Sequence, residues 1–258
     1  MTSILALSGG FTWLGALLPE AMHNMPHHQG QRLAHSMLVV VIVLGLALLA
    51  RLALNRTAKG RDGLVPEANL KPKNLFELYV EAMLNMVRGI LGKEDGDYYF
   101  PLIAGLFLYI LVSNLMGVLP GFAPPTDHIN TNLPMALTVF VVYNVAGIIR
   151  QGPVNYFKHL LGPVLWLGPL MFLVEAIGHL VRPASLSIRL YGNMFGDHLV
   201  LDIFMNQLPD LVGAVLGWGL PVLFLGLGIF VSLIQAFVFS LLSLLYISLA
   251  VQKHDDHH

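Results

Sequence analysis

The chain has 258 residues, of which 56% are hydrophobic and only 11% are charged, and its mean hydropathy is +0.71. Soluble domains carry about a quarter charged residues, so this composition predicts an integral membrane protein. The net charge of −1 excludes a general electrostatic attraction to nucleic acid. A sequence without cysteine excludes disulfides and thiolate metal sites and leaves the redox compartment open. No basic segment followed by an apolar one opens the chain, so we expect no cleavable signal peptide.

Hydrophobic runs long enough to cross a membrane recur from residue 36 onwards. A helix of about 20 mostly apolar residues spans a bilayer. The runs predict an all-α polytopic membrane protein with about five membrane helices in a single domain, 36–258, after an extracytoplasmic segment, 1–35. The expected spans lie at about 36–54, 98–119, 133–149, 163–205 and 212–252.

Between the first two spans, apolar residues recur every three or four positions, which is typical of an amphipathic helix. These positions are Leu75, Leu78, Ala82, Met86 and Ile90. The pattern fits a helix on the cytoplasmic surface of the membrane. It fits equally well a connector helix packed on the rest of the protein.

The last hydrophobic run is longer than an ordinary span. From Val212 to Gln252 the sequence contains no Asp, Glu, Lys or Arg. A helix from Pro221 to Gln252 would measure about 48 Å at about 1.5 Å per residue, against a hydrocarbon core of about 30 Å. Such a helix must tilt steeply, bend or project from the bilayer, and a steep tilt would indicate packing against a large partner within the membrane. Our prediction has the last two helices long and steeply tilted.

Lysine and arginine are distributed unevenly about these spans. Of the 14 cations, 11 fall in loops on one side, Arg32 falls on the other, and Arg182 and Arg189 lie in a membrane stretch. Because positively charged loops face the cytoplasm, we expect the N-terminus outside and the C-terminus inside.

The stretch RPASLSIRLYGNMFGDHLVLD, residues 182–202, places ionisable side chains in one of the most apolar parts of the chain. They are Arg182, Arg189, Asp197, His198 and Asp202. By insertion scales, an arginine at the centre of a spanning helix costs about 2.5–3.5 kcal/mol. Such residues usually mark the path of an ion or substrate.

The two arginines differ in how readily they can be explained. Arg182 can avoid the membrane interior by snorkelling to an interface, and the adjacent Pro183 fits a local break there. Arg189 is either a structural arginine paired with Glu175 or Asp202, or a functional cation that faces a water path or a partner's carboxylate. We favour the functional interpretation.

Helical geometry sorts the ionisable residues into two faces. At about 100° per residue, Glu175, Arg182 and Arg189 fall within roughly 60° of one another. His198 lies on the opposite face, and Asp202 lies nearer His198 than Arg189. A continuous helix would thus carry a cation on one face and groups suited to proton exchange on the other.

Other polar residues give weaker indications. Asn114 and Gln235 fit interhelical hydrogen bonds, and His179 fits either an interior polar contact or a proton relay. The histidine-rich segments at 23–28 and 254–258 resemble metal-binding tracts in composition, but solvated tails of this kind are common, so we assign no metal or cofactor. No nucleotide-binding glycine motif and no nucleophile–base pair is evident, so we expect no catalytic site in this chain.

Four segments together resemble one known family. LSIRLYGNMFGDH resembles the signature of subunit a of the F-type ATP synthase. SNLMGVLPGF and PPTDHINTNLPMAL resemble the second and third spans of that family with their connecting loop. LIQAFVFSLLSLLYISLA resembles its last helix, so the similarity extends from about His35 to the C-terminus.

The resemblance implies a mechanism. Subunit a lies beside a ring of c subunits, each with a carboxylate in the membrane, and two half-channels lead to their interface from opposite sides. The essential arginine between the half-channels corresponds to Arg189. It would hold each arriving carboxylate in its ionised form, because a buried cation lowers the pKa of a neighbouring acid. The implied partners are the c-ring, the b-subunit peripheral stalk, the rest of the F1F0 complex and membrane lipid.

Further residues correspond to polar positions of the family. Glu175 matches an acidic position in the half-channel region, and Asn193 matches the asparagine of the arginine motif. Gln235 matches the glutamine of the last helix, and Asn114 a polar position on the second span. Each of these could also be a packing contact.

One pair of positions departs from the family pattern. Many bacterial relatives have Glu nine residues after the arginine and His seven residues before the glutamine, and mitochondrial relatives often exchange them. This chain has His198 and Gly228 at these places. We therefore expect the outer half-channel to combine His198 with Asp197, Asp202 or Glu175.

Two other classes of protein fit parts of the pattern. A secondary transporter could use Arg189 to bind its substrate, although the repeated halves common in transporters are not evident. A structural membrane subunit would have little reason to retain Arg, Glu and His in the membrane. His198 favours H⁺ over Na⁺ as the coupling ion, and the polar termini suit a bacterial inner membrane better than an organellar one.

Overall fold

The computed structural model describes residues 27–57, 72–119, 122, 124–154, 156, 168–202 and 219–251. The long helices are α3 (His27–Thr57), α4 (Pro72–Leu91), α5 (Lys93–Val118), α6 (Ile129–Gln151), α8 (Gly168–Asp202) and α10 (Gly219–Val251), and a short 3₁₀ helix, η2 (Pro125–Asp127), lies between α5 and α6. The described residues form no strand. The expected all-α fold class is confirmed.

Four of the described helices are long and apolar enough to cross a membrane, and they account for the second to fifth expected spans. These segments are Lys93–Val118, Ile129–Gln151, Gly168–Asp197 and Leu225–Val251. Within α3, Leu33–Leu49 forms a shorter apolar stretch where the first span is expected. The chain is a multi-pass membrane protein.

Glycines with positive φ separate α4 from α5 and end α6. Gly92 has φ 79° and Gly152 has φ 78°, a region of backbone conformation that other residues rarely adopt. After Gly92, α5 begins with Glu94 and Asp95 in its first turn, where carboxylates favour the positive end of the helix dipole. The helix therefore begins before the expected boundary at residue 98.

The helix α8 is continuous over 35 residues and contains Pro183 in its interior. The break expected at Pro183 is therefore absent. Pro183 is buried against neighbouring segments, which can compensate for the backbone hydrogen bond that proline removes. The prediction that Glu175, Arg182 and Arg189 share one face assumed a continuous helix, and α8 is continuous over these residues.

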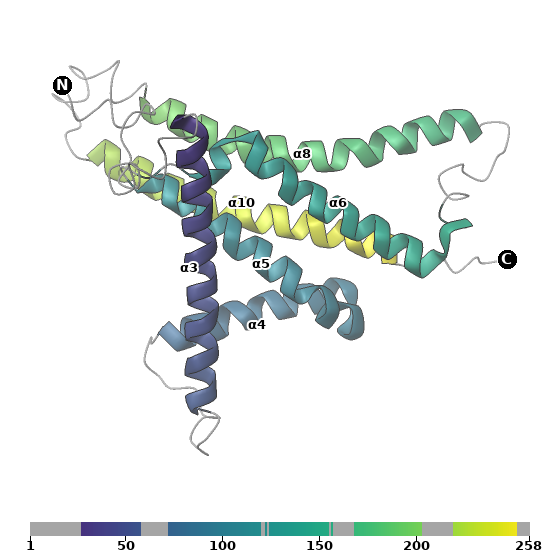
Figure 1. The fold of residues 1–258 in the computed structure, drawn as a ribbon, viewed down its shortest axis with the longest axis horizontal. Helices are drawn as coiled ribbons and strands as arrows, with labels where there is room; N and C mark the ends of the chain where they lie inside the picture. The colour runs from purple at the N-terminus through teal and green to yellow at the C-terminus, as the bar shows by residue number, and fades with distance from the viewer. Residues whose placement is uncertain are drawn as a thin grey trace.

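The membrane helices pack with α10 in contact with α5, α6 and α8, and α8 in contact with α6. Figure 1 shows α6, α8 and α10 running side by side, whereas α3 runs in a different direction and contacts α4, α5 and η2. The common core of the membrane helices contains fully buried side chains such as Ile110, Val139, Leu190, Phe239 and Leu244. The 35 residues of α8 and the 33 of α10 confirm that the last two helices are long.

The helix α4 is amphipathic, as predicted, and its buried stripe includes the predicted positions only in the C-terminal half of the helix. Met83 and Val87 are buried in the core formed with α5, and Met86 and Ile90, two of the predicted positions, pack partly buried against it. Leu75 and Leu78 are 57% and 63% exposed. Packing on α5 therefore covers only part of the predicted stripe.

Tyr79 belongs to the buried stripe and fixes α4 to α5. Its hydroxyl donates a hydrogen bond to the backbone carbonyl of Ala104 at 2.6 Å. Burial raises the pKa of the Tyr79 phenol, so the neutral donor persists at physiological pH. The helix is a packed connector, and its exposed leucines leave an apolar face available to the membrane surface.

Candidate functional site

Three ionisable side chains on the N-terminal half of α8 lie together. Glu175 Oε1 is 3.5 Å from His179 Nε2 and 3.9 Å from Arg182 Nη2. Residues four and seven positions apart share a helix face, so the sequence itself brings them together. The grouping of Glu175 with Arg182 predicted from helical geometry is confirmed.

Two tyrosines from other helices complete this group. The Tyr143 hydroxyl of α6 is 3.2 Å from His179 Nδ1. The guanidinium carbon of Arg182 lies 5.8 Å from the ring centre of Tyr143 and 5.5 Å from that of Tyr246 on α10. We call Glu175, His179, Arg182, Tyr143 and Tyr246 the α8 charged cluster.

Arg182 is therefore held inside the protein by aromatic rings and a carboxylate. Its side chain is 28% exposed, and cation–π contacts with two rings stabilise the charge where it is partly removed from water. Whether Arg182 also lies near a membrane interface stays a prediction. The structure shows that Glu175 pairs with Arg182 and not with Arg189.

Arg189 lies seven residues further along α8 and has far fewer contacts. Its Nη2 is 3.5 Å from Ser185 Oγ, a weak hydrogen bond within the same helix. Among the side chains that the structure describes, Arg189 has no ion-pair partner. The side chain is partly exposed, so a carboxylate from outside the chain could reach it.

Asn193 and Gln235 connect α8 to α10 near the same position. Asn193 Nδ2 donates a hydrogen bond to Gln235 Oε1, and Gln235 is 2% exposed. Within the described residues, Gln235 Nε2 has no partner although it is buried. Asn193 follows Arg189 by four residues and so lies on the same helix face. Two polar positions that the sequence singled out on separate helices are thus in direct contact.

Asn114 belongs to a different polar group, at the end of α5. Its Oδ1 accepts a hydrogen bond from Thr126 Oγ1 at 2.7 Å, and Asn132 Nδ2 donates to the Thr126 carbonyl at 2.8 Å. All three residues are at most 2% exposed. This group holds the segment containing η2 against α5 and α6.

The C-terminal half of α8 approaches this second group closely. A Cβ added at Gly117 of α5 would lie 2.9 Å from Pro124 and 3.0 Å from Met194 of α8. Only glycine permits this packing without displacement of a neighbour. The two ends of α8 therefore lie beside two different polar groups, with Arg189 between them.

Three of the predicted proton-exchange residues lie in the last turns of α8. Asp197 is partly buried. The side chains of His198 and Asp202 lie outside the described residues, so their predicted grouping stays a prediction. In the described part of the chain, no group of three His, Asp or Glu side chains could hold a metal ion.

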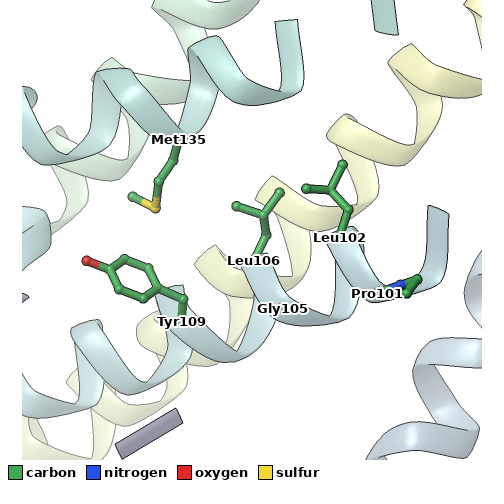
Figure 2. A pocket seen from close by; sticks show the side chains of 6 residues that line it. All are labelled: Pro101, Leu102, Gly105, Leu106, Tyr109 and Met135. Atoms are coloured by element: carbon green, nitrogen blue, oxygen red, sulfur yellow. The ribbon is translucent and has the colours of Figure 1, made fainter. Parts of the chain in front are cut away.

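A shallow groove on α5 is chemically different from these polar groups. Its volume is about 330 Å³, and its lining comprises Pro101, Leu102, Gly105, Leu106, Tyr109 and Met135 (Figure 2). The lining has no charged side chain. The groove therefore offers no group for ion transfer.

The sequence indicated part of this arrangement and missed the rest. The four-residue spacing of Glu175 and His179 could have identified that pair. Tyr143, Tyr246 and Thr126 gave no such signal, because their roles depend on contacts between helices distant in sequence. Chemically, the arrangement combines a carboxylate–imidazole pair with a separate arginine available to an anion.

Comparison with known proteins gives one consistent result. Residues 34–248 match the family model described as ATP synthase A chain. ATP synthase subunit a 2 of Syntrophotalea carbinolica is 45% identical over 86% of this chain and 86% of its own length. ATP synthase subunit a of Bdellovibrio bacteriovorus is 37% identical over 95% of this chain and 99% of its own, and that of Geobacter sulfurreducens is 42% identical over 86% and 87%. The chain belongs to the ATP synthase A chain family.

Proposed function

We propose that this chain is the proton-translocating subunit a of an F-type ATP synthase, a non-catalytic component of the membrane sector. In this proposal it provides two half-channels and an arginine that faces the carboxylates of a c-subunit ring. Proton flow through the half-channels drives rotation of the ring and hence ATP synthesis by the rest of the F1F0 complex. The b-subunit peripheral stalk would hold the chain in place.

The observation that carries the proposal is that Arg189 has no ion-pair partner among the described side chains. A guanidinium in a membrane helix requires a compensating anion, and a permanent partner within the chain would neutralise it. Arg189 has only the weak contact with Ser185 among the described side chains. A cation in this state suits anions that arrive and leave in turn, as the carboxylates of a rotating ring would.

The surface around Arg189 supports an intramembrane partner. Ile188 and Phe195 on α8 are 57% and 48% exposed, so apolar side chains flank the cation. A c-subunit helix could pack on this surface and present its carboxylate to Arg189 in a site shielded from water. Shielding strengthens the interaction between the two charges.

The remaining polar residues receive roles on the two sides of Arg189. Glu175 lies in the half-channel region, and the outer half-channel combines His198 with Asp197, Asp202 or Glu175. Asn193, Gln235 and Asn114 provide hydrogen bonds along these paths. Because imidazole titrates near physiological pH, His198 favours protons as the coupling ion.

The proposed setting is a bacterial inner membrane, with the N-terminus outside and the C-terminus in the cytoplasm. The distribution of Lys and Arg supports this orientation. A single cysteine at Asp127 would be accessible to an impermeant label only from the outside. The natural chain has no cysteine, so the labelling is unambiguous; labelling from the cytoplasm alone would contradict the topology.

The central test uses the assembled complex in native membranes. We expect a c-ring and F1 subunits to co-purify with the chain under mild detergent. Arg189→Ala should assemble but lose proton-driven ATP synthesis, and His198→Ala should assemble and synthesise ATP more slowly. Purification without c subunits, or normal coupled synthesis by assembled Arg189→Ala complexes, would contradict the proposal.

A further inference from the structure

The α8 charged cluster contains a histidine whose two ring nitrogens face different partners. His179 Nε2 faces Glu175 Oε1 at 3.5 Å, and Nδ1 faces the Tyr143 hydroxyl at 3.2 Å. The His179 side chain is 15% exposed, whereas that of Glu175 is 44% exposed. The imidazole thus links an accessible carboxylate to a phenol that is 1% exposed.

The Tyr143 hydroxyl can hold one particular tautomer of this imidazole. It lies 3.2 Å from Nδ1 and also 3.5 Å from the backbone carbonyl of His179. It can therefore accept a hydrogen bond from Nδ1–H while donating its own proton to the carbonyl. In that tautomer the lone pair of Nε2 points towards Glu175.

We propose that His179 is the proton-exchange partner of Glu175 and that Tyr143 positions it for this step; the inference rests on the proposed function of the chain. The O–H bond of the Glu175 carboxylic acid breaks, and an N–H bond forms at His179 Nε2. The products are a carboxylate and an imidazolium, and the net charge of the pair is unchanged. The imidazolium then releases its Nε2 proton to water on the proton path, which its 15% exposed side chain can reach, and Glu175 takes up the next proton from its own exposed side.

The same heavy-atom positions serve both states of the pair. Before and after the transfer, Nδ1–H donates to Tyr143, and Tyr143 donates to the carbonyl. No buried polar group loses its partner, so the transfer avoids a penalty of about 1–3 kcal/mol. The separation of 3.5 Å between Nε2 and Oε1 is at the long limit of a hydrogen bond, and the hydrogen bonds of proton-transfer groups are often long in resting structures.

Charged and titratable groups surround His179. Arg182 on α8 lies 3.9 Å from the Glu175 carboxylate, so its positive charge attracts the carboxylate and repels the imidazolium. Tyr143 of α6 and Tyr246 of α10 place their rings beside Arg182 and keep it in this position. Tyr156, which follows α6, donates a hydrogen bond to Asn144 at 2.6 Å. Arg182 therefore acts on the two products of the transfer in opposite directions.

The test measures passive proton flux through membrane vesicles that contain the assembled complex stripped of F1. His179→Gln and Glu175→Gln should each reduce the flux about tenfold or more, within the range that a positioned acid–base group contributes. The double variant should be no slower than the slower single variant, because one transfer step is lost in each case. Multiplied effects in the double variant would show independent roles and overturn the proposal, as would native flux in His179→Gln.

Tyr143→Phe distinguishes positioning from packing. The variant keeps the ring beside Arg182 and removes only the hydroxyl that holds the Nδ1–H tautomer. We expect the pH profile of the proton flux to shift in Tyr143→Phe. In His179→Gln we expect the part of this profile that depends on the His179 imidazole to disappear. Tyr109→Phe on α5, which removes a hydroxyl far from the cluster, is the matched control and should keep the native profile. An unchanged profile in assembled Tyr143→Phe complexes would overturn the role of the hydroxyl.

The same vesicles separate this inference from the proposed function. If native vesicles conduct protons and Arg189→Ala abolishes coupling while His179→Gln behaves as the native protein, only the His179 inference fails. If native vesicles show no flux that depends on this chain, the proposed function itself fails. Assembly of every variant is checked by co-purification of the c subunits.

Discussion

Arg182 and Arg189 lie on the same helix, seven residues apart, but their surroundings differ. Arg182 contacts two tyrosine rings and a carboxylate, whereas Arg189 has one weak hydrogen bond to Ser185 among the described side chains. The sequence already favoured Arg189 as the functional cation, but it did not show which side chains contact Arg182. The difference shows that a charge in a membrane helix can be a structural element at one position and available for a transient partner at another.

We expect the greatest difference between the two arginines in coupled ATP synthesis. Arg189→Lys should reduce coupled ATP synthesis by about a hundredfold or more, the scale typical of losing one preorganised charged contact. Lysine keeps the charge but lacks the planar fork of donors, and it can be neutralised when desolvated. Arg182→Lys should retain much of the activity, because a point charge still contacts the rings and Glu175. Equal losses of coupled ATP synthesis in Arg189→Lys and Arg182→Lys would show that the two arginines do not differ in function.

The next prediction compares how much Arg182 and Arg189 each contribute to the free energy of unfolding. Arg182→Met should lower the free energy of unfolding of the detergent-solubilised protein by about 1–2 kcal/mol, since it removes cation–π contacts that are partly shielded from water. Arg189→Met should leave this stability unchanged or raise it, because the removed cation has no ion-pair partner among the described residues. Denaturation followed by helical circular dichroism measures both. A greater loss of stability in Arg189→Met would contradict the comparison.

A smaller effect concerns the contact between α8 and α10 beside Arg189. Asn193→Ala and Gln235→Ala should each destabilise the protein, and their double-mutant cycle should give a coupling energy of about 0.6–1.7 kcal/mol, as for other hydrogen bonds between membrane helices. We expect activity to fall more than stability, because this contact sets the position of the helix face that carries Arg189. Strict additivity of the two substitutions would argue that the side chains act separately.

The smallest effect is expected at an exposed arginine. Arg88 Nε donates to Asp97 Oδ1 at 2.7 Å, a shorter contact than any ionic contact of Arg182, but both side chains are well exposed. Water and salt screen such a pair, so Arg88→Ala should cause no measurable loss of stability or activity. A loss comparable to that of Arg182→Met, measured in the same denaturation experiment, would show that location in the membrane is not what distinguishes the arginines.

Some of these features could be predicted from short spacings in the sequence. Hydrophobic runs determined the helices, because about 20 apolar residues can satisfy their backbone hydrogen bonds in lipid only as a helix. The spacing of seven residues placed Glu175 and Arg182 on one face, and the structure confirms their contact. For α4 the same kind of reasoning predicted the amphipathic period, but only packing on α5 shows that Met86 and Ile90 contact the core while Leu75 and Leu78 are exposed.

The membrane class, the approximate spans, the family and the unusual charges on α8 could all be predicted from the amino-acid sequence. These properties depend on composition and on positions within one helix, which are local. The aromatic contacts of Arg182 became evident only from the packing of the helices, because Tyr143 and Tyr246 come from helices remote in sequence. The same packing also brought Asn193 to Gln235 and His179 to Tyr143. Contacts between helices depend on their relative rotation and offset, which no periodicity within a single helix specifies.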